Sequence, residues 1–444
     1  MKPYKVLVVD DSAFMRKIIS DLIEKDADFQ VTATATNGRE AIEKINKLRP
    51  DLVTMDVEMP EMNGLEALKI IMASDPLPVI MLSGINEEGM KETILALEWG
   101  AFDFIRKPSI SNSQDITGVG ESLREQMKEA MLAREQREAR ASAFRMPDIA
   151  PLETTVLPTT QRLIPDKPKV ELKSSIKNEG IRKPLGKQPI DSTIPKKATK
   201  PVVSTRAPVP EKTKSRSKVE NKPILPKPVL ESIVEVSSDP PVLSPDRISG
   251  SKDLHKLVAV GCSTGGPRAL KVFLEKIPAD FPAPIVIVQH MPPNFTRSLA
   301  QRLNTFSPLE VLEAEQGMIL RKGAAYIAPG GYHLQVTPSS RGQYAVVLTK
   351  EEARNGHRPS VDVLFESLLP LTSLDRHVLL MTGMGSDGAR MMKSLYDSGV
   401  TSTFAESEET CVVYGMPRSA VELQCVKYVL PLQEIAPRLV QAVK

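Results

Sequence analysis

Acidic, hydroxyl and basic side chains recur at the ends of the apolar runs in the first quarter of the chain. They are Asp10, Asp11, Asp56, Ser83 and Lys107. In an open parallel sheet the carboxyl ends of the strands face one crevice, so these side chains should meet there. The carboxylates would repel one another, and a hard cation such as Mg²⁺ would relieve that repulsion. Lys107 and the Ser83 hydroxyl could then contact phosphoryl oxygens.

The acid pair also has a purely structural alternative. Asp11 or Ser12 could cap a helix that begins at Ala13, because short polar side chains accept hydrogen bonds from the first backbone N–H groups of a helix. Five such positions, each at the end of a predicted strand, favour the binding site.

A second group of residues is typical of nucleophilic chemistry. The segment Gly-Cys-Ser-Thr-Gly-Gly-Pro at 261–267 follows an apolar run and precedes a predicted helix, which is the layout of a turn that lifts Ser263 to the helix N-terminus. A phosphate-binding loop is the rival, but the segment lacks the Gly-Lys-Ser/Thr ending of a P-loop and the spacing of a dinucleotide-binding loop. The glycines centre on Ser263, so we do not expect Cys262 to be the nucleophile.

A serine nucleophile needs a base, and the base needs an orienting group. Of the five histidines, His290 ends the run 285–289 and should share the sheet edge with Ser263. Asp387 lies in a glycine-rich turn that also follows a predicted strand and offers backbone N–H groups to an oxyanion. The structural alternatives are helix capping by His290 and by Asp387. A conventional hydrolase order would instead require Asp362 and His377, which are placed less well.

Two segments of the chain alternate short apolar runs with amphipathic stretches of helix length. This alternation predicts parallel sheets covered on both faces. In the first segment the predicted strands are 6–9, 30–35, 52–55, 79–82 and 102–105, and a long helix is predicted over 121–143. In the second segment they are 257–260, 285–289, 324–328, 344–349, 377–381 and 401–404, with a meander-like insert near 319–349.

Between these segments, residues 145–251 are rich in Pro, Lys, Ser and Thr. Such a composition buries too little apolar area to offset the ordering entropy, so we predict a disordered linker. Residues 161–230 contain 18 Lys/Arg and six Asp/Glu, a balance of +12, whereas the 444-residue chain has a net charge of only +3. The remainder therefore sums to −9, which argues against nucleic acid as a partner.

The composition also bounds the class of protein. With 41% hydrophobic residues the chain can form real cores, and its three cysteines form neither a CxxC pair nor an even set. That usage suits a reducing compartment. We find no apolar run long enough for a signal peptide or a membrane span, and we expect a cytoplasmic protein without membrane insertion.

The segments VVDDS, MDVEMPEMNG, MLSG and FIRKP resemble the receiver domain of response regulators. The resemblance implies that Asp56 accepts a phosphoryl group from a histidine kinase. It implies Asp10, Asp11, Asp56 and the Glu58 main-chain carbonyl as Mg²⁺ ligands. Ser83 and Lys107 would contact the phosphoryl group.

The segments VGCSTGGP, VIVQHMPPNF, AYIAPGGYHL, RPSVDVLF and LLMTGMGSDGA resemble the catalytic domain of CheB-type protein-glutamate methylesterases. The resemblance implies Ser263 as nucleophile, His290 as general base and acid, and Asp387 as orienting carboxylate, with no cofactor. Thr264 and Met384 would lie at the active site, the latter lending its N–H to the oxyanion. Substrates would be glutamyl methyl esters of chemoreceptors, with glutamine deamidation as a second activity.

The two resemblances predict an α/β architecture with two doubly wound parallel-sheet domains, flavodoxin-like and Rossmann-like. The expected boundaries are a receiver at 1–125, a connecting helix at 126–144, the linker at 145–251 and the methylesterase domain at 252–444. In this family the unphosphorylated receiver is expected to cover the esterase site, and the tether here looks longer than usual. The alternative function is a non-catalytic response regulator that binds a partner through its C-terminal domain.

Overall fold

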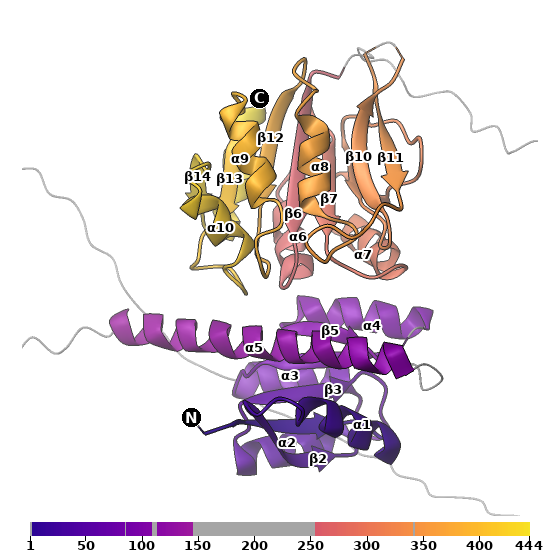
Figure 1. Ribbon diagram of the computed structural model, residues 1–444, viewed down its shortest axis with the longest axis vertical. Helices are drawn as coiled ribbons and strands as arrows, with labels where there is room; N and C mark the ends of the chain where they lie inside the picture. The colour runs from indigo at the N-terminus through magenta and orange to yellow at the C-terminus, as the bar shows by residue number, and fades with distance from the viewer. Residues whose placement is uncertain (1, 85, 109–112, 145–253, 341) are drawn as a thin grey trace, which may run out of the picture. The chain divides into compact units, whose positions relative to one another are not determined.

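The computed structural model describes residues 2–84, 86–108, 113–144, 254–340 and 342–444. The predicted linker over 145–251 lies outside these residues, as does the predicted start of the C-terminal domain at 252. The described residues form two parallel sheets with their covering helices (Figure 1).

The N-terminal sheet has five parallel strands in the order β2-β1-β3-β4-β5. Its strands are β1 (Tyr4–Val9), β2 (Phe29–Ala35), β3 (Leu52–Asp56), β4 (Val79–Ser83) and β5 (Asp103–Arg106). Its helices are α1 (Ala13–Ile23), α2 (Gly38–Leu48), α3 (Gly64–Ser74), α4 (Glu87–Glu98) and α5 (Ser113–Phe144). Each predicted strand of this region is present within two residues of its expected bounds.

Alternate residues of β1 show why both faces of this sheet must be covered. Val6 and Val8 are buried in the same cluster as side chains of α1 and α5, whereas Leu7 and Val9 are buried with side chains of α2, α3 and α4. Successive residues of a strand point to opposite faces, so the uninterrupted apolar run places the sheet between two helical layers.

Helix α5 begins earlier than the sequence indicates. It runs without a break from Ser113 to Phe144, and Leu123 and Met127 are fully buried against the receiver core. The helix expected at 126–144 is therefore the second half of a receiver helix. The glycines at 118 and 120 had weakened the helical pattern in its first half.

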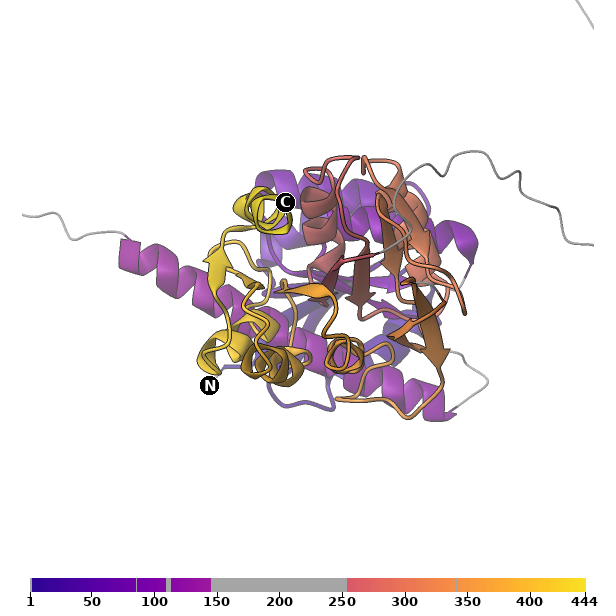
Figure 2. The same ribbon diagram turned by 90° about the horizontal axis from the view of Figure 1, so that it is seen from above.

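The C-terminal sheet has seven parallel strands in the order β14-β13-β12-β6-β7-β9-β8. They are β6 (Lys256–Cys262), β7 (Ile285–Gln289), β8 (Glu310–Glu313), β9 (Ala324–Ile327), β12 (Asp375–Leu380), β13 (Thr403–Glu406) and β14 (Tyr428–Leu430). The helices are α6 (Gly266–Leu274), α7 (Phe295–Asn304), α8 (Val361–Leu368), α9 (Ala389–Asp397), α10 (Met416–Glu422) and α11 (Leu432–Val443). This region runs from red to yellow in Figure 2.

The predicted meander near 319–349 differs from the structure. Strand β9 belongs to the main parallel sheet, where it pairs with β7 and β8. Strands β10 (His333–Pro338) and β11 (Tyr344–Thr349) form a separate antiparallel hairpin, and Ile319 adds an isolated antiparallel bridge to Ala345 on β11, so this part of the meander is present. Strands β8, β10 and β14 were not among the predicted strands.

The strand order reverses between β6 and β12, which are neighbours in the C-terminal sheet. From β6 the chain builds one side of the sheet and then returns to β12 to build the other. Such a switch point opens a crevice at the carboxyl ends of the two strands, where ligands bind in sheets of this kind.

Within the part of the chain that the structure describes, no helix is long and apolar enough to cross a membrane.

Candidate active site

Ser263 lies in the tight turn that joins β6 to α6, at this switch point. Its backbone N–H donates to the Thr382 carbonyl beyond β12 at 3.0 Å, and its own carbonyl accepts from Gln289 Nε2 at 3.0 Å. A Cβ at Gly266 would lie 1.8 Å from Gln289 Oε1, so a larger residue here would force the Gln289 side chain on β7 to move. The turn is thus fixed by neighbours on both sides.

His290 follows β7 directly, and its side chain is only 6% exposed. Its Nε2 lies 2.8 Å from Asp387 Oδ2. Its Nδ1 is buried and has no hydrogen-bond partner among the described residues. Ser263, His290, Thr264 and Met384 line one cavity of about 590 Å³. His290 therefore contacts Asp387 and shares a cavity with Ser263, Thr264 and Met384.

Asp387 is a buried carboxylate with several donors around it. Besides His290, it accepts from Asn355 Nδ2 and Ser360 Oγ, both at 2.8 Å, and from the backbone N–H groups of Val361 at 2.6 Å and Asp362 at 3.1 Å. Burial alone would raise the pKa of Asp387. The hydrogen bonds from His290, Asn355 and Val361 override burial and hold that pKa well below its usual range.

The structural alternatives for these residues do not match the geometry. Helix α9 begins after Gly388 without a side-chain cap, so Asp387 is not its cap. The helix after His290 is preceded by Asn294. In the other candidate pair, His377 bonds Ser402 at 2.6 Å, whereas Asp362 accepts from the backbone N–H of Gly388 and Met391.

Sequence reasoning missed Asn355, Ser360 and His357. They lie in the segment between β11 and α8, which has no hydrophobic period. A signal was the polar block NGHRPS directly before the helix, with a glycine and a proline that are typical of a tight loop, and its last three residues begin the segment RPSVDVLF that carries the family resemblance.

The three predicted receiver carboxylates also come together. Asp10, Asp11 and Asp56 each offer an oxygen within 4.8 Å of the others. Lys107 Nζ lies 2.9 Å from Asp10 and 2.7 Å from Asp56. Burial, together with the charge of Asp10, raises the pKa of Asp56 to about 6 even though Lys107 opposes the shift. This residual crowding of negative charge fits a site for a cation.

The neighbouring residues of this site are engaged in local contacts. The Asp56 carboxylate accepts from the Glu58 backbone N–H. The Ser83 hydroxyl donates to the Gly84 carbonyl at 3.1 Å and accepts from Thr93 at 2.7 Å. The cap of α1 is Ser12, whose side chain accepts from Met15 N–H, so Asp11 is not required for capping.

Cys262 lies beside Ser263 but is unsuited to nucleophilic attack. Its side chain is fully buried, and its thiol lies 3.1 Å from Gln289 Oε1. Burial, with the nearby Glu406 charge, raises the pKa of this thiol far above its ordinary value. A neutral buried thiol is inert.

Receiver residues contact the esterase site in this structure. The Thr264 hydroxyl donates to Asp103 Oδ2 on β5 at 2.6 Å, and Asp103 and Phe104 line the cavity that contains Ser263. Arg302 on α7 donates to both oxygens of Glu98 on α4, at 2.9 and 3.0 Å.

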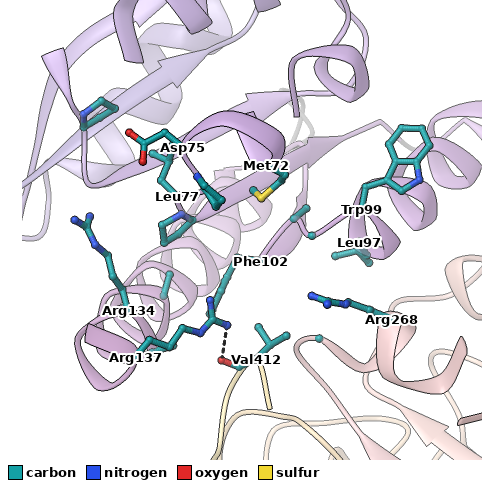
Figure 3. A pocket seen from close by; sticks show the side chains of 18 of the residues that line it. Met72, Asp75, Leu77, Leu97, Trp99, Phe102, Arg134, Arg137, Arg268 and Val412 are labelled. Carbon is teal, nitrogen blue, oxygen red and sulfur yellow. Dashed lines mark hydrogen bonds between the residues drawn. The ribbon is translucent and has the colours of Figure 1, made fainter. Parts of the chain in front are cut away.

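A second cavity of about 760 Å³ contains none of the candidate site residues. It is lined mainly by receiver side chains, with Arg268 and Val412 at its edge (Figure 3). Arg137 on α5 donates to the Val412 carbonyl there at 3.4 Å. Because the larger cavity contains none of the predicted catalytic residues, the smaller cavity is the candidate active site.

Both regions of the chain match known protein families. A family model described as CheB methylesterase matches residues 258–439, and one described as response regulator receiver domain matches residues 6–117. The chain is 39% identical to the protein-glutamate methylesterase/protein-glutamine glutaminase of Halalkalibacterium halodurans over 440 residues, 99% of this chain and 98% of that protein. The chain belongs to the CheB family.

Two further CheB proteins are similar to this chain. A protein of the same name from Geobacillus kaustophilus is 38% identical over 443 residues, 100% of this chain and 99% of that protein. The solved CheB methylesterase catalytic domain of Thermotoga maritima is 42% identical and is covered to 98%, against 42% of this chain, with a TM-score of 0.41. Both full-length CheB relatives therefore align with this chain almost from end to end.

Proposed function

We propose that this chain hydrolyses glutamyl methyl esters of chemoreceptors and deamidates their glutamines, with Ser263, His290 and Asp387 as its catalytic machinery. The family membership supports the reaction class, since the full-length relatives are named for both activities. The observation that carries the assignment of residues is the contact of 2.8 Å between His290 Nε2 and Asp387, which leaves Nδ1 without a partner among the described residues, in a histidine that lines the same cavity as Ser263.

The reaction follows from this arrangement. Ser263 Oγ attacks the ester carbonyl while His290 Nδ1 takes the hydroxyl proton, and the negatively charged Asp387 stabilises the imidazolium. The C–O bond to the methoxy group then breaks, and His290 returns the proton so that methanol leaves. Water, deprotonated by the same nitrogen, cleaves the acyl-enzyme and releases a glutamate carboxylate. A glutamine substrate loses ammonia instead of methanol.

An oxyanion forms in both steps and needs donors that are already in place. Thr264 and Met384 line the same cavity as Ser263. We assign the oxyanion to their backbone N–H groups, because Thr264 follows the nucleophile in the turn and Met384 lies in the glycine-rich segment after β12.

The receiver part of the proposal is control by phosphorylation. Asp56 would accept a phosphoryl group from a histidine kinase, with Mg²⁺ held by Asp10, Asp11, Asp56 and the Glu58 carbonyl. The cation would neutralise charge between the carboxylates and the incoming phosphoryl group. Lys107 already bridges Asp10 and Asp56, while Ser83 must exchange its contact with Gly84 for a phosphoryl oxygen. The contact of Asp103 with Thr264 supports a receiver that restrains the esterase site.

The cellular setting is also part of the proposal. All three cysteines are buried and free. We place the protein in the reducing cytoplasm, where such thiols persist.

The decisive experiment measures methanol release from methylated receptors with and without a small acyl phosphate and Mg²⁺. We expect stimulation by the phosphodonor and no release by a Ser263→Ala variant. Covalent labelling of Ser263 by a fluorophosphonate tests the alternative of a non-catalytic partner-binding domain. An unlabelled wild-type chain that releases no methanol would support that alternative.

A further inference from the structure

A second imidazole lies against His290 in the candidate active site. The rings of His290 and His357 are stacked, with centroids 3.7 Å apart and an angle of 11° between their planes. Both residues line the cavity that contains Ser263. The hydrogen bond to Asp387 fixes the position of His290 Nε2 but still allows the imidazole ring to tilt about that bond. The stacked ring of His357 restricts this tilt.

The loop that carries His357 is bonded to the same carboxylate as His290. The backbones of Arg354 and His357 are paired, with N···O distances of 3.1 and 3.0 Å. Between them, Asn355 adopts φ +55° and directs its Nδ2 to Asp387 and Asp362, at 2.8 Å each. The loop therefore fixes the carboxylate and the ring face of His290 together.

The charge state of His357 suits a ring stacked on a base that must gain a proton. Burial, and then the proximity of His290, lower the pKa of His357 to about 4, although Asp387 opposes the shift. The other charged groups of the loop between β11 and α8 are Lys350, Glu351, Glu352, Arg354 and Arg358, and those of α8 are Asp362 and Glu366. Two imidazolium rings at this separation would repel each other, so a neutral His357 lets His290 carry the proton alone.

We propose that His357 is a positioning residue of the esterase, which holds the His290 imidazole in the plane that joins Asp387 to Ser263. This proposal rests on the proposed function. His357 takes no proton in the reaction; its contribution is a flat, uncharged surface at van der Waals distance. A shift of the base by about 1 Å is enough to lower a rate by about 100-fold, so the loss of this surface should be costly.

The test compares His357→Phe, which keeps a flat neutral ring, with His357→Ala, which removes it. In the phosphorylated full chain we expect the phenylalanine variant to keep kcat within about threefold of wild type. The alanine variant should lose about 10- to 100-fold in kcat with KM changed less than about threefold. The matched control is His255→Phe, the same change at an exposed histidine outside the cavity, which should leave both constants unchanged.

The pH profile separates positioning from proton transfer. The phenylalanine variant should keep the wild-type shape of kcat/KM between pH 5 and 9, because the group it replaces is uncharged there. If the phenylalanine variant lost the acidic or the basic limb of this pH profile, or were as slow as the alanine variant, His357 would have an acid–base role and the proposal would be overturned. An alanine variant as fast as wild type would overturn it as well.

Two further measurements keep the outcome readable. Thermal unfolding shows whether the alanine variant is folded, and labelling of Ser263 by a fluorophosphonate should be slower in it but reach completion. Should the alanine variant fail to fold, His357→Gln, which removes the aromatic face but keeps a polar side chain, takes its place with the same expected loss. Retained methanol release by Ser263→Ala would instead reject the proposed function, independently of His357.

Discussion

Asp56 of the receiver and Asp387 of the esterase are buried aspartates near strand ends of two parallel sheets, yet their environments shift their pKa values in opposite directions. Burial raises the pKa of Asp56 to about 6, because Lys107 and one backbone N–H do not outweigh desolvation and the charge of Asp10. Asp387 has five hydrogen-bonding partners, and its pKa lies well below normal. The partners, rather than burial, decide whether such a carboxyl group is poised to react or held as a fixed anion.

The largest expected effect separates the two sites by their chemistry. Ser263→Ala should lower methanol release by about 1,000-fold or more, because no other hydroxyl replaces the nucleophile. Phosphorylation of the receiver by a small acyl phosphate should continue in this variant. Cys262→Ala is the matched control and should retain activity, since its thiol is buried and protonated. The reverse result would move the nucleophile to the thiol.

Asp387→Asn should cost about 100- to 10,000-fold in kcat, because the amide neither orients His290 correctly nor balances its charge. It should also lower stability at neutral pH. The pKa of Asp387 is lower in the folded than in the unfolded chain, so its contribution to stability is present above about pH 4 and is lost as the pH falls through the folded value. Chemical denaturation at pH 7 checks the sign, and a stabilised variant would contradict it.

Asp56→Asn should act on stability in the opposite direction. The pKa of Asp56 is raised by folding, so its favourable contribution is complete below about pH 4 and is lost as the pH rises through about 6. Removing the buried charge should therefore stabilise the receiver by about 2 kcal/mol at pH 8 without divalent cations, and by less at pH 5. Thermal unfolding at the two pH values measures this difference.

The same variant should abolish stimulation of methanol release by the phosphodonor. Its activity without the phosphodonor should equal that of the unphosphorylated wild type. Retained stimulation would place the phosphoryl acceptor elsewhere in the chain.

The smallest effect concerns the contact between the two regions. Asp103→Ala removes the acceptor of the Thr264 hydrogen bond and should raise the basal esterase rate of the unphosphorylated full chain by about fivefold, the equivalent of about 1 kcal/mol. Asp28→Ala, at an exposed receiver aspartate outside the cavity, is the control. An unchanged basal rate in Asp103→Ala would mean that this hydrogen bond does not restrain the site.

Much of this arrangement follows from local patterns in the sequence. Apolar runs that end in Asp10, Asp56 or His290 specify buried parallel strands, and parallel strands bring their carboxyl ends together. Glycines at 265 and 266 indicate the turn at Ser263. These signals lie within a few residues of the groups they place, so they can be recognised without knowledge of the fold.

The remaining site residues depend on contacts distant in sequence. Asn355 and His357 reach His290 and Asp387 from a loop that has no period, and nothing in that loop indicates which strand ends it will meet. Likewise, the first half of α5 is held by the receiver core, whereas its own glycines disfavour a helix. Tertiary packing overrides local preference in both cases.

The burial of Cys262, Cys411 and Cys425 makes the chain convenient for spectroscopy. Because maleimide dyes react with exposed thiolates, brief treatment with such a dye should leave the three cysteines of the native protein unlabelled. Cysteines introduced at Leu132 and Tyr396, both exposed, could carry a donor and an acceptor fluorophore. Energy transfer between the two fluorophores would then report changes in the distance between the receiver and the esterase as the phosphodonor is added.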